Sequence, residues 1–508
     1  MKLLETLAAV LTVITSASPA SADWLQATSR HFVLYADTSE ASLRKQAVAL
    51  ERMDQGLRRF MKTDDPPEAA SNRLTVFVVS ERDIRSLCRC DNVAGFYQAR
   101  VNGPVAFSAK SVGMGEGTSD SGRIVLFHEY AHHFLLGSYG IAFPAWYSEG
   151  FAEFASTMKI SPGKVLIGSA AQHRAWGLLA GQRLSAAQMF DTAQWGKLKR
   201  DGFDAFYGRG WLMTHYFHFN PERRKQFVRY LTLLNTGTPG VVAATEAFGD
   251  LKALDRDLAG YLGRSTIPGM TMMMGDTPEP VVTVRTLGAG EAALIRLRME
   301  SVRGVDAKTA APLFAKAAPI AARYPEDSVA QGWFAEMAYD AGDNAVAEKA
   351  ADRAVASDAK SVQGLLYKAR VRLRALSQDQ KADAAAWTAA RKPIIAANRL
   401  DPDDAEPLWL FWESFGMEGR EPIKSAMTGL YRAQELVPQD PSVRFAAAAS
   451  RIMARENDAA KRLLRPLAYD PHAGNDNPAT RMLAALDAGK TGAAVMAAAG
   501  DKPSAAAE

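Results

Sequence analysis

The sequence has few cysteines, almost no excess of one charge, and no long apolar run after its first residues. Its two cysteines, Cys88 and Cys90, are too few for a disulfide framework, and a bond across the single residue between them would require an unusually tight loop. The 60 basic and 56 acidic residues give a formal charge of +4. That charge is too small to indicate a nucleic-acid or anionic-membrane partner without a local basic patch. We therefore expect packed cores to stabilise the protein, and no nucleic-acid partner.

No stretch after residue 22 approaches the roughly twenty apolar residues of a transmembrane helix. The first 22 residues have a different pattern: Lys2 precedes an apolar run from Leu7 to Ile14, and small residues then end at Ala22. This pattern predicts a cleavable secretory signal, the alternative being a buried N-terminal helix. We expect cleavage after Ala22, a periplasmic or secreted protein, and no integral membrane segment in the mature chain.

The chain has ample material for several cores. It has 508 residues, of which 48% are hydrophobic and 23% are charged. This composition is typical of globular protein and excludes disorder over most of the chain. The length corresponds to roughly three domains of ordinary size.

Residues 23–263 mix strand and helix patterns, with strands first and helices afterwards, which is an α+β order. Asn102-Gly103 predicts a hairpin between two of the strands. A glycine-rich loop over 111–122 separates strands from helices. The predicted strands cover 31–36, 74–79, 93–100 and 104–110, and the predicted helices cover 39–62, a short segment from Glu81, 123–136, 145–158, 203–219 and 222–234.

The second half of the sequence predicts a different architecture. Residues 264–305 form an expected connector that is strand-like over 281–285, and residues 306–488 are almost entirely helical and alanine-rich. Small residues recur where paired helices would cross, with a spacing that resembles the tetratricopeptide repeat and its period of about 34 residues. We predict three to five such repeats, the alternative being a non-repeating helical bundle. We expect residues 489–508 to be a disordered tail.

The strongest functional pattern is the H-E-x-x-H sequence that runs from His128 to His132 within the helix predicted over 123–136. Residues four apart lie on one face of a helix, so both imidazoles can reach one zinc ion, and Glu129 is angled to hold the attacking water. The alternative is a helix with satisfied polar residues, but these groups are costly to bury without an ion or a partner. The pattern therefore predicts a Zn²⁺ site with two histidine ligands and a catalytic glutamate.

The helix predicted over 145–158 offers the third protein ligand that a catalytic zinc site needs. Glu149 lies seventeen residues beyond His132, after a short loop that lets the two helices fold back antiparallel. Glu153 lies one turn further on the same face, where it is placed to accept the free N–H of a ligating histidine. We predict Glu149 as the third ligand and Glu153 as a supporting residue behind a histidine ligand.

In these two helices the chain resembles the gluzincin metallopeptidases. The segment that starts at Ser148 is similar to the N-E-G-F-A segment of aminopeptidase-N-type enzymes, with serine in place of asparagine, and the spacing of Glu149 and Glu153 is similar to the E-x-x-x-D of thermolysin. From residue 24 to residue 262 the chain looks most like exported bacterial peptidase MA-like domains. The resemblance implies a zincin-like α+β fold that hydrolyses peptide bonds in a peptide or protein substrate.

The segment from Tyr207 to Gly210 is similar to the Y-x-K-G segment of the same enzymes. The resemblance implies that Tyr207 hydrogen-bonds the oxyanion, the alternative being an ordinary half-buried tyrosine. The stretch 101–107 has no acid that would bind a substrate's amino terminus, so aminopeptidase specificity is not implied. We expect the strand over 104–110 to lie beside the cleft, where an extended peptide could pair with it.

Three other features rank lower as functional sites. His133 points about 100° away from its ligating neighbour, so we expect it to pack or to form a hydrogen bond. Cys88 and Cys90 make a weak metal site without a nearby histidine. The glycines of 111–122 lack the Lys-Ser/Thr of a phosphate loop and fit a flap over the cleft.

Two functions are compatible with these patterns. The first is an exported zinc metallopeptidase whose helical repeats bind a protein partner or the substrate. The second is a catalytically silent zinc-binding scaffold whose repeats mediate protein–protein interaction. A purely structural zinc would need a fourth protein ligand, and the sequence offers no obvious candidate.

Overall fold

The computed structural model describes residues 23–66, 72–90, 95–110, 121–192, 194–470 and 476–500. The predicted signal segment, most of the glycine-rich loop and the end of the predicted tail lie outside these ranges. None of the helices within them combines the length and apolar character needed to cross a membrane.

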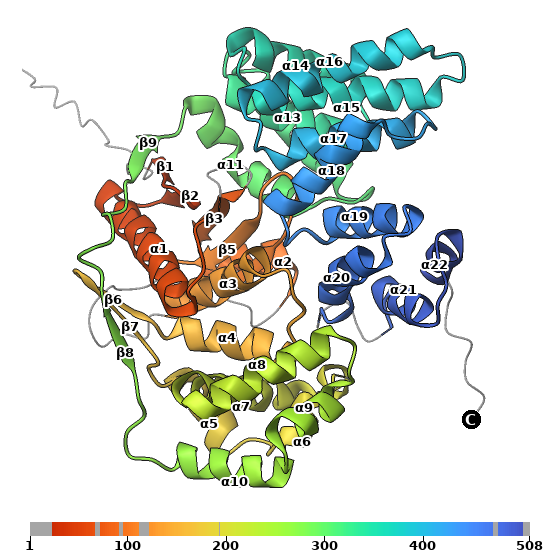
Figure 1. The fold of residues 1–508 in the computed structure, drawn as a ribbon. Helices are drawn as coiled ribbons and strands as arrows, with labels where there is room; N and C mark the ends of the chain where they lie inside the picture. The colour runs from red at the N-terminus through yellow and green to blue at the C-terminus, as the bar shows by residue number, and fades with distance from the viewer. Residues whose placement is uncertain are drawn as a thin grey trace, which may run out of the picture.

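A six-stranded mixed sheet forms the centre of the α+β half (Figure 1). Its strand order is β4-β5-β3-β2-β1-β9, with parallel pairing of β2 with β3 and of β3 with β5, and antiparallel pairing elsewhere. Its strands are β1 (Trp24–Thr28), β2 (Phe32–Asp37), β3 (Leu74–Val79), β4 (Gly95–Gln98), β5 (Val105–Ala109) and β9 (Thr283–Thr286). A second, antiparallel sheet contains β6 (Lys159–Ser161), β7 (Lys164–Ile167) and β8 (Met270–Met273).

The helices of this half have clear end signals in the sequence. The Ser39 side chain caps α1 by accepting from the backbone N–H of Ser42, and the Asn220 side chain caps α8, which begins with Pro221. These helices are α1 (Glu40–Met61), α2 (Glu81–Cys88), α3 (Ser121–Ser138), α4 (Ala145–Ser156), α5 (Ala175–Leu179), α6 (Ala186–Phe190), α7 (Arg200–Phe219), α8 (Pro221–Asn235), α9 (Gly240–Phe248) and α10 (Leu251–Leu262). The predicted α+β order is confirmed. The elements that were not predicted are β1, β6, β7, β8, α5, α6, α9 and α10.

The second half consists of helices joined in antiparallel pairs that stack in chain order (Figure 1). Helix α13 begins at Ser328 and α15 at Val362, 34 residues later, which is the predicted period. The prediction of helical repeats is thus confirmed. The helices are α11 (Ala289–Val302), α12 (Ala310–Ala321), α13 (Ser328–Asp340), α14 (Asn344–Ser357), α15 (Val362–Gln378), α16 (Ala384–Leu400), α17 (Ala405–Met417), α18 (Lys424–Leu436), α19 (Pro441–Met453), α20 (Asn457–Ala468), α21 (Pro478–Asp487) and α22 (Ala493–Ala498).

Both faces of the large sheet are buried, each against a different part of the chain. On one face Leu34 and Val76 belong to the core formed with α1, α3 and α4. On the other face Phe77 and Phe107 belong to a core that includes Leu294 of α11 and further residues of α12 and α13. Alternate side chains of a strand point to opposite faces, so the same strands serve both cores.

This packing differs from the predicted division of the chain at residue 263. The expected connector contains β9, which completes the large sheet beside β1, and α11, which covers that sheet. The predicted disordered tail contains α22, whose Val495 is fully buried against the preceding helices. The helical half and the α+β half therefore share a core.

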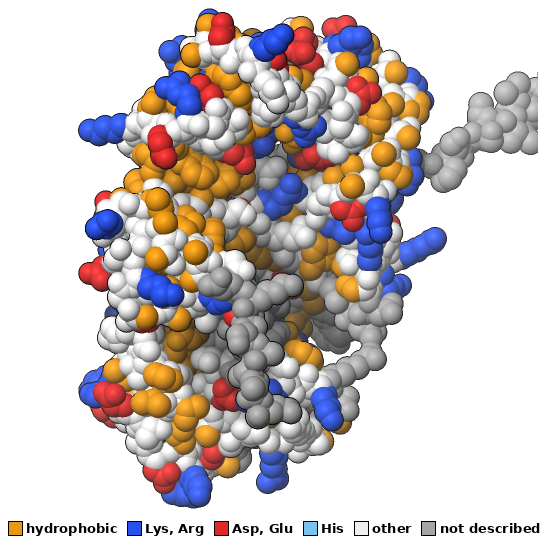
Figure 2. Space-filling view, turned by 90° about the vertical axis from the view of Figure 1, so that its right-hand side faces the viewer, with side chains coloured by type: hydrophobic (Ala, Val, Ile, Leu, Met, Phe, Trp, Pro, Cys, Tyr) orange, Lys and Arg blue, Asp and Glu red, His pale blue; other side chains and the backbone are white. Residues whose placement is uncertain are grey.

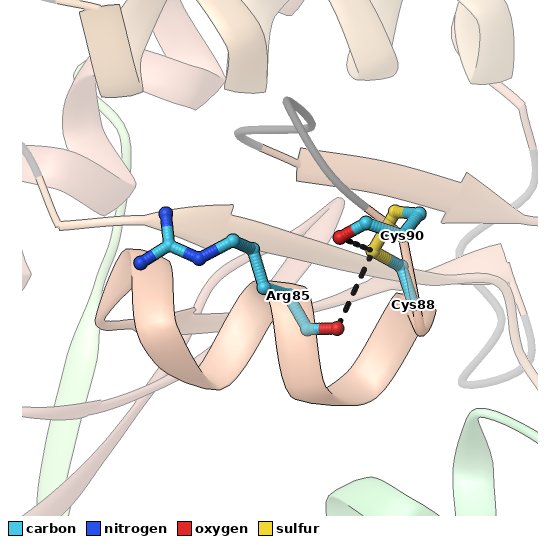
Figure 3. The surroundings of a disulfide bond; sticks show 3 residues. All are labelled: Arg85, Cys88 and Cys90. Atoms are coloured by element: carbon cyan, nitrogen blue, oxygen red, sulfur yellow. Dashed lines mark hydrogen bonds between the residues drawn. A yellow bond between two sulfur atoms is a disulfide. The ribbon is translucent and has the colours of Figure 1, made fainter.

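Cys88 and Cys90 form a disulfide at the end of α2 (Figure 3). The expectation that their spacing disfavours a bond is wrong, because Arg89 between them adopts the left-handed conformation, with φ of 55°. Its backbone N–H caps α2 at the carbonyl of Arg85, and the turn places the two cysteine Cα atoms 5.2 Å apart, within disulfide range. With both sulfurs bonded to each other, the pair does not offer the metal site considered from the sequence.

Candidate metal centre

Helix α3 carries the two histidines of the H-E-x-x-H pattern. Its apolar side, with Phe127, Ala131 and Phe134, is buried in the core of the α+β half. The imidazoles of His128 and His132 emerge on the less buried side, with 3.2 Å between their Nε2 atoms. The helical spacing therefore brings the two ring nitrogens together as expected.

Helix α4 folds back on α3 and adds a carboxylate to this pair. Glu149 Oε2 lies 3.4 Å from His128 Nε2 and 3.5 Å from His132 Nε2, and the Glu149 side chain is only 2% exposed. A tetrahedral zinc ion with bonds of 2.0–2.1 Å holds its ligand atoms about 3.3 to 3.4 Å apart. The donor set and its spacing thus fit a zinc ion on three protein ligands.

Behind the histidines, a second carboxylate is held by two further residues. Glu153 Oε1 lies 3.2 Å from His128 Nδ1, the nitrogen that faces away from Glu149. His173 Nε2 lies 2.6 Å from Glu153 Oε2, and Arg174 donates to Glu153 Oε1 at 2.7 Å. Such a carboxylate fixes the orientation and the tautomer of a ligating imidazole. His173 and Arg174 were not predicted, because they lie on a turn twenty residues further on, with no local pattern.

The electrostatics of the cluster favour ionised carboxylates. Burial acts to lower the pKa of His128, but hydrogen bonds with Glu149 and Glu153 raise it to about 10. Burial acts to raise the pKa of Glu149, but the charge of His132 and hydrogen bonds with both histidines hold it well below its usual range. Glu149 is therefore in the deprotonated state that a metal ligand requires.

Helix α7 approaches α4 unusually closely at two glycines. A Cβ atom on Gly150 would lie 2.3 Å from the carbonyl oxygen of Gly210, and one on Gly210 would lie 2.7 Å from the carbonyl oxygen of Trp146. Neither position has room for a larger residue. Because Gly150 follows Glu149 and Gly210 lies about one turn after Tyr207, this contact brings the tyrosine to the histidine–glutamate cluster.

Tyr207 packs against His128, a candidate ligand, and against Arg174, which holds Glu153. Its ring centre lies 6.1 Å from that of His128, and the guanidinium of Arg174 lies 4.8 Å from its ring centre. Burial, followed by the negative charge of Glu149, raises the pKa of Tyr207. The phenol therefore keeps its proton at neutral pH and remains a hydrogen-bond donor.

A cavity of about 800 Å³ connects these groups with more distant parts of the chain. Its lining includes Tyr207, Glu129 and the three candidate ligands, and also β4. The expectation that the strand over 104–110 borders the cleft is wrong, because β4 pairs along β5 and is itself the edge strand. Two stretches of the helical repeats, 438–444 and 466–470, contribute further lining residues.

A second cluster also brings three candidate ligand atoms within 4.8 Å of one another, at His31, Asp54 and Asp65. Here the Nε atom of Arg58 lies 2.8 Å from Asp54 Oδ2 and 3.0 Å from Asp65 Oδ1. His31 Nδ1 also contacts Glu51 Oε2 at 2.8 Å. A guanidinium already neutralises these carboxylates, so this cluster is a salt-bridge network.

His133 behaves as the sequence predicted for a non-ligand. Its Nδ1 atom lies 3.1 Å from the hydroxyl of Tyr97, and burial lowers its pKa to about 3. It is therefore a neutral hydrogen-bonding residue.

Comparison with protein-family models finds no match, and comparison with curated proteins finds none either. Among solved structures, "MamA RS-1 ArsTM double mutant" matches with a TM-score of 0.27 and 13% identity, over 38% of this chain and 100% of that chain. "MamA 41-end from Desulfovibrio magneticus RS-1" matches with a TM-score of 0.27 and 14% identity, over 36% of this chain and 97% of that chain. Each match leaves more than three fifths of this chain without a counterpart.

Proposed function

We propose that this protein is a zinc-dependent metallopeptidase. The observation that carries the proposal is the triangle of His128 Nε2, His132 Nε2 and Glu149 Oε2, whose sides of 3.2 to 3.5 Å suit a tetrahedral zinc ion. Three protein ligands leave a fourth position for water or substrate, as catalytic sites require. The resemblance of the same helices to gluzincin metallopeptidases supports peptide bonds as the substrate.

The proposed roles of the side chains follow from their chemistry. When bound, the zinc ion supplies Lewis-acid polarisation of the scissile carbonyl. Glu129, which lines the same cavity, accepts a proton from the attacking water and passes it to the leaving amine nitrogen. Tyr207 donates its hydroxyl proton in a hydrogen bond to the carbonyl oxygen as negative charge develops there. Glu153 keeps the His128 ring oriented.

We also propose that the protein is exported to the periplasm or secreted. The signal-like pattern of residues 1–22 supports this location. The disulfide between Cys88 and Cys90 supports it independently, because disulfides persist mainly in oxidising compartments.

The second candidate is a zinc-binding scaffold without turnover, whose helical repeats mediate protein–protein interaction. The extent of the helical repeats, from α12 to α22, favours this candidate. Such stacked helices present extended surfaces on which partner proteins commonly bind.

Substitution of Glu129 by Gln separates the two candidates. The variant should retain zinc, because no ligand is removed, and should lose hydrolysis of a peptide library by about 10²- to 10⁴-fold. Metal analysis and mass spectrometry of the digested library measure both properties. Parent protein that binds zinc and cleaves no peptide in the library would support the scaffold instead.

Substitution of Tyr207 by Phe tests the proposed oxyanion contact. It should lower kcat by about 10²-fold with little change in KM, because the lost hydrogen bond matters most in the transition state. Tyr216 on the same helix is the matched control, since its ring packs on Tyr261 at 4.7 Å, away from the cavity. Tyr216→Phe should leave steady-state kinetics nearly unchanged. Equal losses in the two variants would indicate general damage to α7.

A further inference from the structure

The helical half contributes basic side chains to the cavity that holds the candidate metal centre. Arg444 of α19 and Arg303 at the end of α11 both line this cavity, and so does Arg100, which follows β4. Of these, Arg100 has two acids nearby. Its charge helps Arg298 to lower the pKa of Glu336, and it opposes the burial that raises the pKa of Asp440. Among the described residues, the acids that line the cavity are Glu129, Glu149 and Asp470.

Arg444 is unusual among the buried arginines of this half. It is only 3% exposed, and among the described residues no carboxylate lies within ion-pair distance of it. Burying a charge without a counter-charge is unfavourable, so such groups are normally paired. Three other arginines in this half follow that rule, each with a glutamate: Arg298 with Glu336, Arg370 with Glu406, and Arg391 with Glu418.

The contacts of Arg444 neutralise its charge only in part. Its Nε and Nη2 atoms donate to the carbonyl oxygen of Pro438, with 2.8 Å from Nε to that oxygen. Burial lowers the pKa of Arg444 to about 10, so the guanidinium is still charged at neutral pH. Arg303 forms no ion pair within 4 Å of a described acid either. Burial followed by the charge of Arg89 lowers its pKa, against the opposing charges of Glu300 and Asp306. Among the described residues, the cavity is therefore bordered by two arginines without an ion pair, of which Arg444 is the more deeply buried.

We propose that Arg444, assisted by Arg303, binds a carboxylate of the substrate and thereby selects which peptides reach the candidate metal centre. This inference rests on the proposed peptidase function and specifies its substrate class. The carboxylate belongs to an acidic side chain or to the free C-terminus of the peptide. A guanidinium binds carboxylates with paired, charge-assisted hydrogen bonds, and it does so most strongly away from water.

The proposal gives the helical repeats a part in the active cleft. The helices α19–α22 lie on the right-hand side of Figure 1, and Figure 2 shows that side from the front. Blue Lys and Arg side chains are visible in the hollowed middle of this face. Pro438, whose carbonyl holds Arg444, lines the same cavity, so the position of the guanidinium depends on the segment between α18 and α19. Selectivity and catalysis would then depend on residues more than 300 positions apart.

A peptide series tests the proposal on the full-length zinc-loaded protein. A cleavable neutral peptide receives a single Glu or Gln at successive positions, and each member is made with a C-terminal acid and with a C-terminal amide. We expect kcat/KM to be at least about tenfold higher for a carboxylate in one register, and the acid and amide series distinguish a side-chain carboxylate from the C-terminus. Equal kcat/KM across the whole series would overturn the proposal.

Three variants assign the preference to the proposed residues. Arg444→Gln should abolish the carboxylate preference, so that kcat/KM becomes about equal for the acidic and neutral peptides. Arg303→Gln should reduce the preference by a smaller factor. Arg353→Gln is the matched control, because Arg353 is exposed on α14, away from the cavity. If Arg444→Gln does not fold, Arg303→Gln and Arg444→Lys still test whether these two arginines produce the carboxylate preference. An unchanged preference in the folded Arg444 and Arg303 variants would overturn the assignment.

Binding to the Glu129→Gln protein separates failure of this inference from failure of the proposed function. Fluorescence anisotropy should show tighter binding of the preferred carboxylate peptide than of its neutral analogue, with the difference lost in the Arg444→Gln double variant. Selective binding without cleavage by the parent protein would reject the peptidase and keep the carboxylate site. Cleavage with no carboxylate selectivity in binding or turnover would reject the carboxylate site alone.

Discussion

Among the described residues, two clusters bring histidine nitrogens and carboxylate oxygens to within 4.8 Å of one another, and they differ in which groups face the carboxylates. The cluster around His31 contains Arg58, whose guanidinium touches both Asp54 and Asp65. In the cluster of His128, His132 and Glu149 the histidines themselves face the carboxylate, with His128 Nε2 and His132 Nε2 lying 3.4 and 3.5 Å from Glu149 Oε2.

The presence of ligand-type residues therefore does not by itself define a metal site. In the His31 cluster, one permanent cation satisfies the carboxylates, and a metal ion would have to displace it. In the other cluster the groups that face Glu149 are imidazoles, which can give up their protons and bind the ion themselves. Variants of the two clusters should therefore differ in zinc content, stability and pH dependence.

Removal of one histidine from each cluster should change the metal content in only one of the two variants. His132→Ala should lose the bound zinc, because two protein ligands remain. His31→Ala should keep one zinc per chain. Metal analysis of the purified, gel-filtered variants measures the stoichiometry, and loss of zinc in the His31 variant would contradict the distinction between the clusters.

Removal of Arg58 should leave the carboxylates of the His31 cluster without the cation that contacts both of them. Arg58→Met leaves the fully buried Asp54 without its guanidinium partner, although the Tyr130 hydroxyl still donates to it, and should lower the free energy of unfolding by about 3 kcal/mol. Added zinc should restore part of this stability, since the three ligand atoms remain close together. Urea unfolding with and without zinc measures both effects, and an unchanged midpoint for the variant would show that Arg58 does not balance the cluster.

Glu153 and Glu51, which contact a histidine of the first and second cluster respectively, should differ in their effect on zinc affinity. Glu153→Ala should weaken zinc binding by about 10- to 100-fold, because it frees the His128 ring to rotate. Glu51→Ala, which removes the corresponding contact from His31, should leave zinc affinity unchanged. Competition with a chelator gives the two affinities. A greater loss for Glu153→Ala than for Glu149→Ala would reassign the third ligand.

The smallest expected effect is a pH dependence of stability from the His31 cluster. Burial acts to lower the pKa of His31, but the hydrogen bond with Glu51 and the charges of Asp54 and Glu51 raise it above its usual value, against the opposing charge of Arg58. A raised histidine pKa stabilises the fold below about pH 6.5, and this contribution is lost as pH rises through the folded-state value.

The control for this pH dependence is His31→Asn. Thermal unfolding between pH 6 and pH 9 should show a flatter dependence for the variant than for the parent protein. Identical profiles would mean that His31 does not carry the effect.

Local patterns were sufficient to predict much of the candidate site. The i, i+4 spacing on α3 and the short connection to α4 determine how His128, His132 and Glu149 meet. Tyr207 could be identified only through a resemblance, because its position depends on the close contact of Gly150 with Gly210. His173 and Arg174 had no signal, since a single turn that reaches back to Glu153 leaves no periodic pattern.

The fold too could be predicted where local sequence patterns determine it, and not where contacts between distant segments do. The strands over 74–79 and 105–109 and the hairpin at Asn102-Gly103 follow from short apolar runs and turn chemistry. The burial of Phe77 and Phe107 under α11–α13 could not be predicted, because apolar residues on both faces of a strand do not say which helices will cover them. For the same reason the predicted domain boundary at residue 263 crosses a shared core.

The pairing of β1 with β9 has a consequence for how the chain folds. Leu25 pairs with Thr286, so the edge of β1 has its native partner only after more than 250 further residues have been synthesised. Closing so long a loop is slow, and an exposed strand edge tends to pair with other chains while it waits. During synthesis the nascent chain thus carries an incomplete sheet, and protection of that edge is a requirement for productive folding of this protein.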